Sequence, residues 1–292
     1  MTAHGPRLVF TTKRGWRLFA LNSFAAFGAL SAVVQFYSAV WAPEGGLDRP
    51  GLIAVAASVA SLVFGFWRAY PKRAARRHLG RPDVTICVKV GDLFNQPGAH
   101  LVVGFCDTFD TDTTNSVIID ERSVQGQLTK RIYGGNFATL DAELAPALSS
   151  ASIASTELST AKPHGKLKRY RIGTVAVLGN PGQRRIFAVA YTKMGNTLIA
   201  QSTVNDLWRA LGNLWTAVYL NGQRGTVAMP IVGSELARID CVDRESLLQM
   251  ILLSFVARSR EQLVCKELVV VIHKPDYDKL NMLEVQAFMD TL

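Results

Sequence analysis

Three short loops carry the residue types that could bind a polar ligand. Gly91-Asp92 and the segment Cys106–Asn115 each follow a short apolar run, and Ile231–Arg238 follows a third. A glycine at position 233 would let main-chain N–H groups approach an anion closely. Carboxylates in the middle loop would repel an anion but attract hydroxyl groups or a cation: Asp107, Asp110 and Asp112.

The other reactive side chains form no catalytic or metal-binding pattern that we recognise. The cysteines contain no CxxC pair and no histidine at metal-ligand spacing: Cys87, Cys106, Cys241 and Cys265. This pattern indicates reduced thiols in the cytoplasm and no zinc site. Three histidines lack an Asp or Ser partner at motif spacing and are expected to be structural: His100, His164 and His273. We therefore expect no catalytic residue and no metal.

Short apolar strands that alternate with helices must position these loops. We expect strands at Val84–Val90, Leu101–Phe105, Val117–Ile119, Arg171–Leu178, Arg185–Tyr191, Gly225–Pro230 and Leu268–Ile272. We expect helices at Ser123–Tyr133, through Val204–Val218 with Thr203 as cap, through Leu247–Phe255 with Asp243 as cap, and at Asp276–Asp290. Residues 134–166 should form short helices and an exposed loop. The alternation predicts an α/β/α sandwich with a mixed sheet, in which ligands bind outside the carboxyl ends of the strands.

Two charge-free stretches precede this domain, Leu18–Val40 and Pro50–Trp67. A hydrocarbon core of about 30 Å needs roughly 20 helical residues, so we predict a transmembrane hairpin over 18–70, with spans at 18–40 and 50–68. The Gly/Pro-rich turn Trp41–Pro50 joins them. A cleaved signal peptide and a hairpin buried in a soluble core are the alternatives.

Basic residues flank the hairpin, in a tail over 1–17 and in a predicted linker over 71–83. Because Lys/Arg-rich flanks stay on the cytoplasmic side, both termini should be cytoplasmic and should attract anionic lipid head groups. This placement accounts for much of the formal charge of +9, so nucleic acid is not an expected partner. The small residues Ala57, Ser61 and Gly65 could pack the two helices together or form a contact between subunits.

The three loops resemble those of a macro domain, the ADP-ribose-binding fold. Gly91-Asp92-Leu93 resembles the Gly-Asp-Ile of that family, Leu101–Asp107 occupies the place of its Asn-containing segment, and Thr226–Ser234 resembles its second phosphate loop. Two further segments are similar to the macro-like domain of Thoeris anti-phage effectors: Phe105–Thr111 and Asp120–Gln127. Two membrane helices before such a domain resemble the transmembrane-macro type, and the resemblance then covers nearly the whole chain, with the macro-like domain over 84–292.

The resemblance implies a set of ligand-binding residues. It assigns Asp92 and Leu93 to the adenine end and the segment 230–234 to the diphosphate. The full set is Asp92, Leu93, Cys106, Asp107, Thr108, Phe109, Asp110, Gln125, Gly126, Pro230, Ile231, Val232, Gly233 and Ser234. We expect the acidic loop to recognise the distal ribose and a positively charged group attached to it. The alternatives are a cap or turn role for Asp92, a solvated acidic loop, simple helix capping at Gln125-Gly126 and an ordinary loop at 231–234.

The resemblance also implies an activity. A partner enzyme with a TIR domain would make an ADP-ribose-derived signal, for this type a histidine conjugate of ADP-ribose. Binding would cluster subunits into a homo-oligomer, compromise the bacterial inner membrane and abort the infection. The asparagine and glycines that hydrolytic macro domains use are replaced, so we expect a receptor without a catalytic cofactor. A membrane-anchored ADP-ribosyl hydrolase and a passive anchored module are the alternatives.

Overall fold

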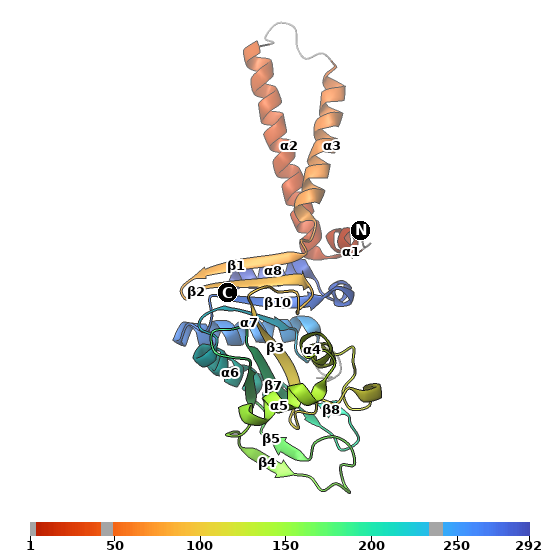
Figure 1. The fold of residues 1–292 in the computed structure, drawn as a ribbon. Coiled ribbons are helices and arrows are strands. Elements are labelled where there is room, and N and C mark those ends of the chain that lie inside the picture. The colour runs from red at the N-terminus through yellow and green to blue at the C-terminus, as the bar shows by residue number, and fades with distance from the viewer. Residues whose placement is uncertain (1–3, 42–48, 234–241) are drawn as a thin grey trace. The chain divides into compact units, whose positions relative to one another are not determined.

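The computed structural model describes residues 4–41, 49–233 and 242–292 and divides into two units (Figure 1). The first unit contains residues 1–73 and 281–287, and the second contains residues 74–280 and 288–292. The helical hairpin belongs to the first unit, and the sheet with the predicted ligand loops belongs to the second. Each unit is described separately below.

The first unit is built from α1 (His4–Thr11), α2 (Lys13–Trp41) and α3 (Pro50–Ala69). Residues Lys13–Val40 and Pro50–Ala69 are both long and apolar enough to cross a membrane. Most of their side chains are exposed, which a hairpin in a soluble core would not tolerate. The helices meet where Gly65 faces Ser23, because a Cβ atom at position 65 would collide with the serine side chain.

A mixed sheet forms the centre of the second unit. Its strand order is β1-β2-β10-β9-β3-β7-β6, and β8 pairs with β7. The inner strands are parallel to one another, whereas β1 and β6 are antiparallel to their neighbours. The bounds are β1 (Ala74–Gly80), β2 (Asp83–Gly91), β3 (His100–Cys106), β6 (Val175–Leu178), β7 (Ile186–Met194), β8 (Ala200–Gln201), β9 (Thr226–Pro230) and β10 (Glu267–His273). The predicted mixed sheet is confirmed.

Helices cover both faces of this sheet. One core cluster joins alternate residues of β3, such as Leu101 and Phe105, to α4 (Val124–Ile132) and α5 (Phe137–Ala147). Since strand side chains alternate between faces, the other residues of β3 and β7 point to the opposite side. There α6 (Val204–Asn221) contacts β7 and packs against α7 (Arg244–Glu261), where the Trp215 and Phe255 rings lie 5.3 Å apart. A separate two-stranded sheet pairs β4 (Ile153–Thr156) with β5 (Lys168–Tyr170).

Three sequence expectations differ from the structure. Val117–Ile119 is not a strand but a bend that follows the short helix η1 (Thr114–Ser116), because it pairs with no strand. The expected helix Asp276–Asp290 is divided into η2 (Lys274–Lys279) and α8 (Met282–Thr291). The division occurs because Leu280 is extended and the Asn281 side chain accepts a hydrogen bond from Leu283 N–H at 3.1 Å.

The third difference lies in the predicted linker over 71–83. Residues 74–80 of this segment form β1, which pairs with β2 from Ala74 opposite Lys89 to Gly80 opposite Asp83. Only Ala75 and Leu79 of β1 are buried, and the three residues between them are exposed, so the segment lacks the two-residue apolar alternation by which strands are recognised in a sequence. The segment without regular structure between helix and sheet is therefore much shorter than expected.

Candidate functional site

A cavity of about 480 Å³ opens at the carboxyl ends of β3, β9 and β10. The last residue of each strand lines it: Cys106, Pro230 and His273. Ligands of open α/β sheets bind at this end of the strands, and the volume is typical of a small-molecule site. The cavity is therefore the main candidate site in the part of the chain that the structure describes.

One wall of the cavity is suited to an anion. The loop after β9 places Ile231, Val232 and Gly233 at the cavity, all three buried. Gly233 has φ +86°, a conformation that side-chain-bearing residues rarely adopt. Ser234, also predicted to bind, lies outside the described residues.

The amino-terminal turn of α4 forms a neighbouring wall. Ser123 caps this helix, since its Oγ accepts a hydrogen bond from Gly126 N–H at 2.9 Å. Val124 and Gln125 line the cavity, and in the described structure neither of their N–H groups donates to a protein acceptor. Helix N-termini with free N–H groups favour negative charge. Gly126 does not line the cavity but lets α4 approach residues 120–121 closely.

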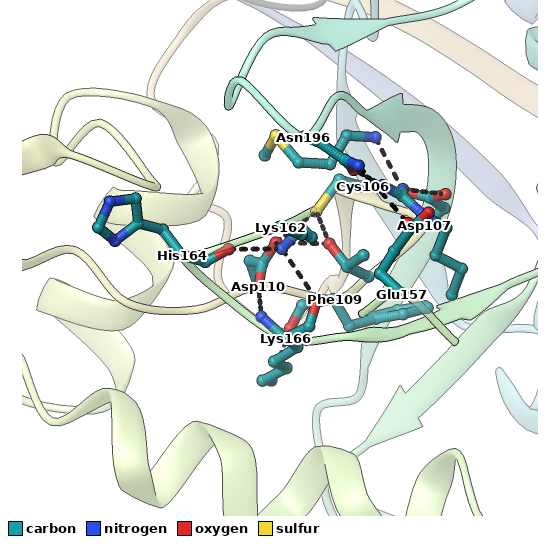
Figure 2. A network of polar contacts seen from close by, with 12 residues as sticks. Cys106, Asp107, Phe109, Asp110, Glu157, Lys162, His164, Lys166 and Asn196 are labelled. Atoms are coloured by element: carbon teal, nitrogen blue, oxygen red, sulfur yellow. Dashed lines mark hydrogen bonds and ion pairs between the residues drawn. The ribbon is translucent and has the colours of Figure 1, made fainter. Parts of the chain in front are cut away.

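The acidic loop after β3 holds internal cations instead of lining the cavity (Figure 2). Asp107 accepts two hydrogen bonds from Arg169 Nη1, at 2.8 and 3.0 Å, and one from Met194 N–H at 2.8 Å. Arg169 also donates to Glu157 at 2.6 Å and to Asn196 at 2.8 Å. Both side chains of the Asp107–Arg169 pair are 5% exposed, so the pair has little access to solvent or ligand.

Asp110 forms a second buried ion pair. Its Oδ2 lies 3.2 Å from Lys162 Nζ, and the two side chains are 1% and 0% exposed. Lys162 Nζ also donates to the main-chain oxygens of His164 and Lys166, each at 2.9 Å, which uses all three of its donors. Thr108 Oγ1 donates to the same carboxylate oxygen. Asp107 and Asp110 therefore meet cations and donors from their own chain, and Thr108 is one of these donors.

Other residues of this loop connect it to the cavity. Gln125 Nε2 donates to the main-chain oxygen of Asp110, so the position of Gln125 depends on that loop. The Phe109 ring is fully buried and stacks on Phe105 at 5.6 Å, in the core rather than in the site. Burial, with the nearby Asp110 charge, raises the pKa of the Cys106 thiol, which makes it a poor nucleophile at neutral pH.

Asp92 and Leu93 lie away from the cavity lining. Leu93 is buried in the core cluster that joins β3 to α4 and α5. The Asp92 carboxylate accepts hydrogen bonds from Arg131 Nη1 at 2.6 Å and from Phe94 N–H at 2.9 Å. Burial alone would raise the pKa of Asp92, but these two bonds and the Arg131 charge lower it below its ordinary value.

Several lining residues were not predicted from the sequence. Thr192 and Met194 come from the end of β7, which extends three residues beyond the strand that we expected. Arg244, whose Nη1 lies 3.2 Å from Asp276 Oδ2, comes from the first residue of α7. Because β7 is parallel to β3, a correct strand end would have placed Thr192 beside Cys106. No group of three or more His, Cys, Asp or Glu side chains in the described ranges could hold a metal ion.

One comparison with known proteins, a match to a family profile, identifies the class of this domain. The sequence profile of the family described as Thoeris protein ThsA, Macro domain, matches residues 86–273. No curated protein matches the chain. Among solved structures, a point mutant of the Oceanobacillus iheyensis macrodomain has a TM-score of 0.49 at 11% identity, over 75% of this chain and 100% of that chain.

Two further solved structures are similar to the chain. A second Oceanobacillus iheyensis macrodomain mutant, solved with ADPR, has a TM-score of 0.47 at 12% identity, over 73% of this chain and 97% of that one. The macro domain of ganglioside induced differentiation associated protein 2 has a TM-score of 0.39 at 11% identity, over 70% of this chain and 84% of that one.

Proposed function

Because the chain belongs to the family of Thoeris protein ThsA macro domains, we propose that the cavity at the carboxyl ends of β3, β9 and β10 binds an ADP-ribose-type ligand. The observation that carries the proposal is the anion-binding wall made by Gly233 and the first turn of α4. Main-chain N–H groups at such a wall suit a diphosphate. Apolar residues of the same cavity, including Val232 and Ile272, suit a base and its ribose.

The acidic loop has an indirect part in this proposal. Asp107 and Asp110 hold the wall that contains Cys106 and Gln125, and they act on the ligand through that wall. The Asp92 carboxylate already pairs with Arg131, so an adenine amine that donates to it would have to compete with this cation. Recognition of the adenine by Asp92 therefore has a cost that an unpaired carboxylate would not have.

The proposal extends to the membrane. The apolar hairpin α2–α3 is the support for a chain that crosses the membrane twice, and the Lys/Arg-rich flanks in the sequence are the support for both termini in the cytoplasm. On infection, a TIR-domain partner would make the signal, and a histidine conjugate of ADP-ribose is the proposed form. Binding would drive homo-oligomerisation and membrane disruption, which requires the ligand to prefer the clustered state over the resting state.

The test uses the full chain in lipid nanodiscs. We expect calorimetric titration to detect binding of ADP-ribose and, more tightly, of its histidine conjugate. Gly233→Ala should weaken binding at least about tenfold, because a Cβ atom at positive φ displaces the loop. The matched control is Gly182→Ala, which also has a positive φ, +82°, but lies in open space on a hairpin turn.

Four outcomes would contradict the proposal or one of its parts. Equal affinities for the two glycine variants would remove Gly233 from the site. No binding of any ADP-ribose compound by the unchanged chain would favour a passive anchored module. Release of free ADP-ribose from the conjugate, followed by chromatography, would instead identify a membrane-anchored hydrolase. In detergent solution, an unchanged mass distribution at saturating ligand would contradict ligand-driven assembly.

A further inference from the structure

A second hollow, of about 500 Å³, lies in the first unit at the beginning of α2. It is lined by Lys13, Arg14, Arg17, Leu18, Leu21 and Glu284. The three cations occupy the first turns of the helix, and the leucines occupy the turns that follow. One end of the hollow is therefore positively charged and the other end is apolar.

The positive charge in this hollow is only partly neutralised. Arg14 Nε donates to Glu284 Oε1 at 3.1 Å, which pairs one cation with the one carboxylate. Lys13 and Arg17 are both exposed, and neither forms an ion pair with any residue that the structure describes. They lie one helical turn apart, at i and i+4, so their side chains share a face of α2. Two positive charges remain for a ligand.

Neighbouring aromatic rings indicate the depth of the hollow in a bilayer. The charge-free stretch begins at Leu18, directly after Arg17. Around this level Trp16 lies 5.5 Å from Phe19, and Phe10 stacks on Phe66 at 5.8 Å. Trp16 is 55% exposed, as a residue at a membrane–water interface would be. The ring cluster and the beginning of the charge-free stretch at Leu18 both indicate that Lys13 and Arg17 lie at the depth of lipid phosphates.

We propose that this hollow is a binding site for one anionic phospholipid. The lipid phosphate would lie between Lys13 and Arg17, and an acyl chain would follow Leu18 and Leu21. This proposal rests on the proposed membrane-spanning hairpin. A free phosphate ion shares the charge but not the acyl chain, so the apolar end of the hollow favours a lipid.

The test measures lipid retention by the full chain. The protein is reconstituted in phosphatidylcholine with or without phosphatidylglycerol, released into detergent, and its bound lipid is counted by native mass spectrometry. We expect the unchanged chain to retain phosphatidylglycerol. The variant Lys13→Gln/Arg17→Gln should retain about 30-fold less, since each cation near the surface contributes about a fivefold factor to lipid affinity. The control Lys72→Gln/Arg73→Gln removes the same charge from the flank of α3, outside the hollow, and should retain the lipid.

Each other result overturns the lipid site. Equal loss in both variants would mean general charge attraction, and displacement of the lipid by inorganic phosphate would mean a simple anion site. Alkaline extraction from pure phosphatidylcholine vesicles distinguishes a wrong lipid-site proposal from a wrong proposal of a membrane-spanning hairpin. Protein that stays in those vesicles while Lys13→Gln/Arg17→Gln retains phosphatidylglycerol refutes the lipid site alone, whereas extracted protein refutes the spanning hairpin.

Discussion

At the residue scale, Asp107 and Asp110 of the loop after β3 form buried ion pairs with cations of their own chain. Their positions could be read from the sequence, and we expected them to face a ligand. Their counter-ions Lys162 and Arg169 come 52 and 62 residues later, in or beside a segment whose structure we could not predict in detail. Pairing over such a separation depends on the tertiary fold, which composition and spacing do not encode locally.

The Lys162–Asp110 pair should be important for stability. Removing one partner of a buried ion pair leaves an uncompensated charge, which costs about 3–5 kcal/mol. We therefore expect Lys162→Ala to lower the free energy of unfolding of the full chain by this amount, measured by urea denaturation in detergent with tryptophan fluorescence. Arg122→Ala removes an exposed partner of Asp120 and should have little effect. Similar losses in both variants would show that burial of the pair is unimportant.

His100 should make stability sensitive to acid. Its Nδ1 accepts from Arg185 N–H at 2.9 Å and its Nε2 donates to Gly222 O at 3.0 Å, which fixes the neutral ring. Burial lowers the pKa of His100 below its ordinary 6.5, despite the opposing effect of the Gly222 bond. The unfolded chain then binds the proton more readily, so stability is retained above pH 6.5 and lost as the pH falls below it.

Thermal melting of the full chain between pH 5 and 8 measures this effect. His100→Gln should reduce the slope of the free energy of unfolding against pH by at most about 1.4 kcal/mol per pH unit. His164→Gln, at an exposed histidine, is the control and should leave the profile unchanged. A profile that His100→Gln leaves as steep as before would assign the acid sensitivity to other groups.

At the element scale, local signals predicted the helices of the second unit well. The caps Thr203 and Asp243 were expected, and each accepts a hydrogen bond from the main-chain N–H group of the third residue after it. Strand β10 was predicted from its apolar, β-branched run. The edge strand β1 was missed because exposed arginines separate its two buried residues. An edge strand of this kind is stabilised mainly by pairing with its partner β2, so its own residues show little of the apolar pattern from which strands are predicted.

The packing of α4 against residues 120–121 should be sensitive to one methyl group. In Gly126→Ala the new Cβ would lie 2.6 Å from Glu121 Cα, and main-chain atoms cannot yield without a shift of the segment. We expect a loss of about 1–3 kcal/mol in stability and weaker ligand binding, since the same segment lines the cavity.

Gly212→Ala is the matched control for this packing. Gly212 is also helical, in α6, but is exposed with open space around it, so alanine should stabilise the protein by up to about 1 kcal/mol. Denaturation and ligand titration of the two variants should therefore give opposite changes in stability. Equal stabilisation by both alanines would contradict the close approach of α4.

At the scale of the whole molecule, the length of the charge-free stretches predicted the two long helices. Helix α2 begins five residues before the stretch at Leu18, so its first turns contain the cations Lys13, Arg14 and Arg17. Such a hairpin can be predicted from the lengths of charge-free stretches, because a helix that spans a bilayer needs about 20 consecutive apolar residues. The cavity could not be predicted in this way, since its walls come from segments far apart in the sequence.

The proposed topology predicts which side of the membrane each flank faces. In intact cells with a permeabilised outer membrane, a charged maleimide should label Glu44→Cys, in the turn between the spans. Lys72→Cys should be labelled only after the inner membrane is opened, and the unchanged chain reports the background from its own cysteines. Labelling of Lys72→Cys in intact cells would reverse or refute the topology.

Only residues 70–73 separate the last residue of α3 from the first residue of β1. A fully extended chain of this length reaches about 14 Å. With α3 in a bilayer, this short connection would prevent the second unit from diffusing away from the membrane. If ligand binding drives clustering as proposed, encounters between copies would then depend on the number of molecules per unit area, and the density of the protein in the membrane would set the threshold for assembly.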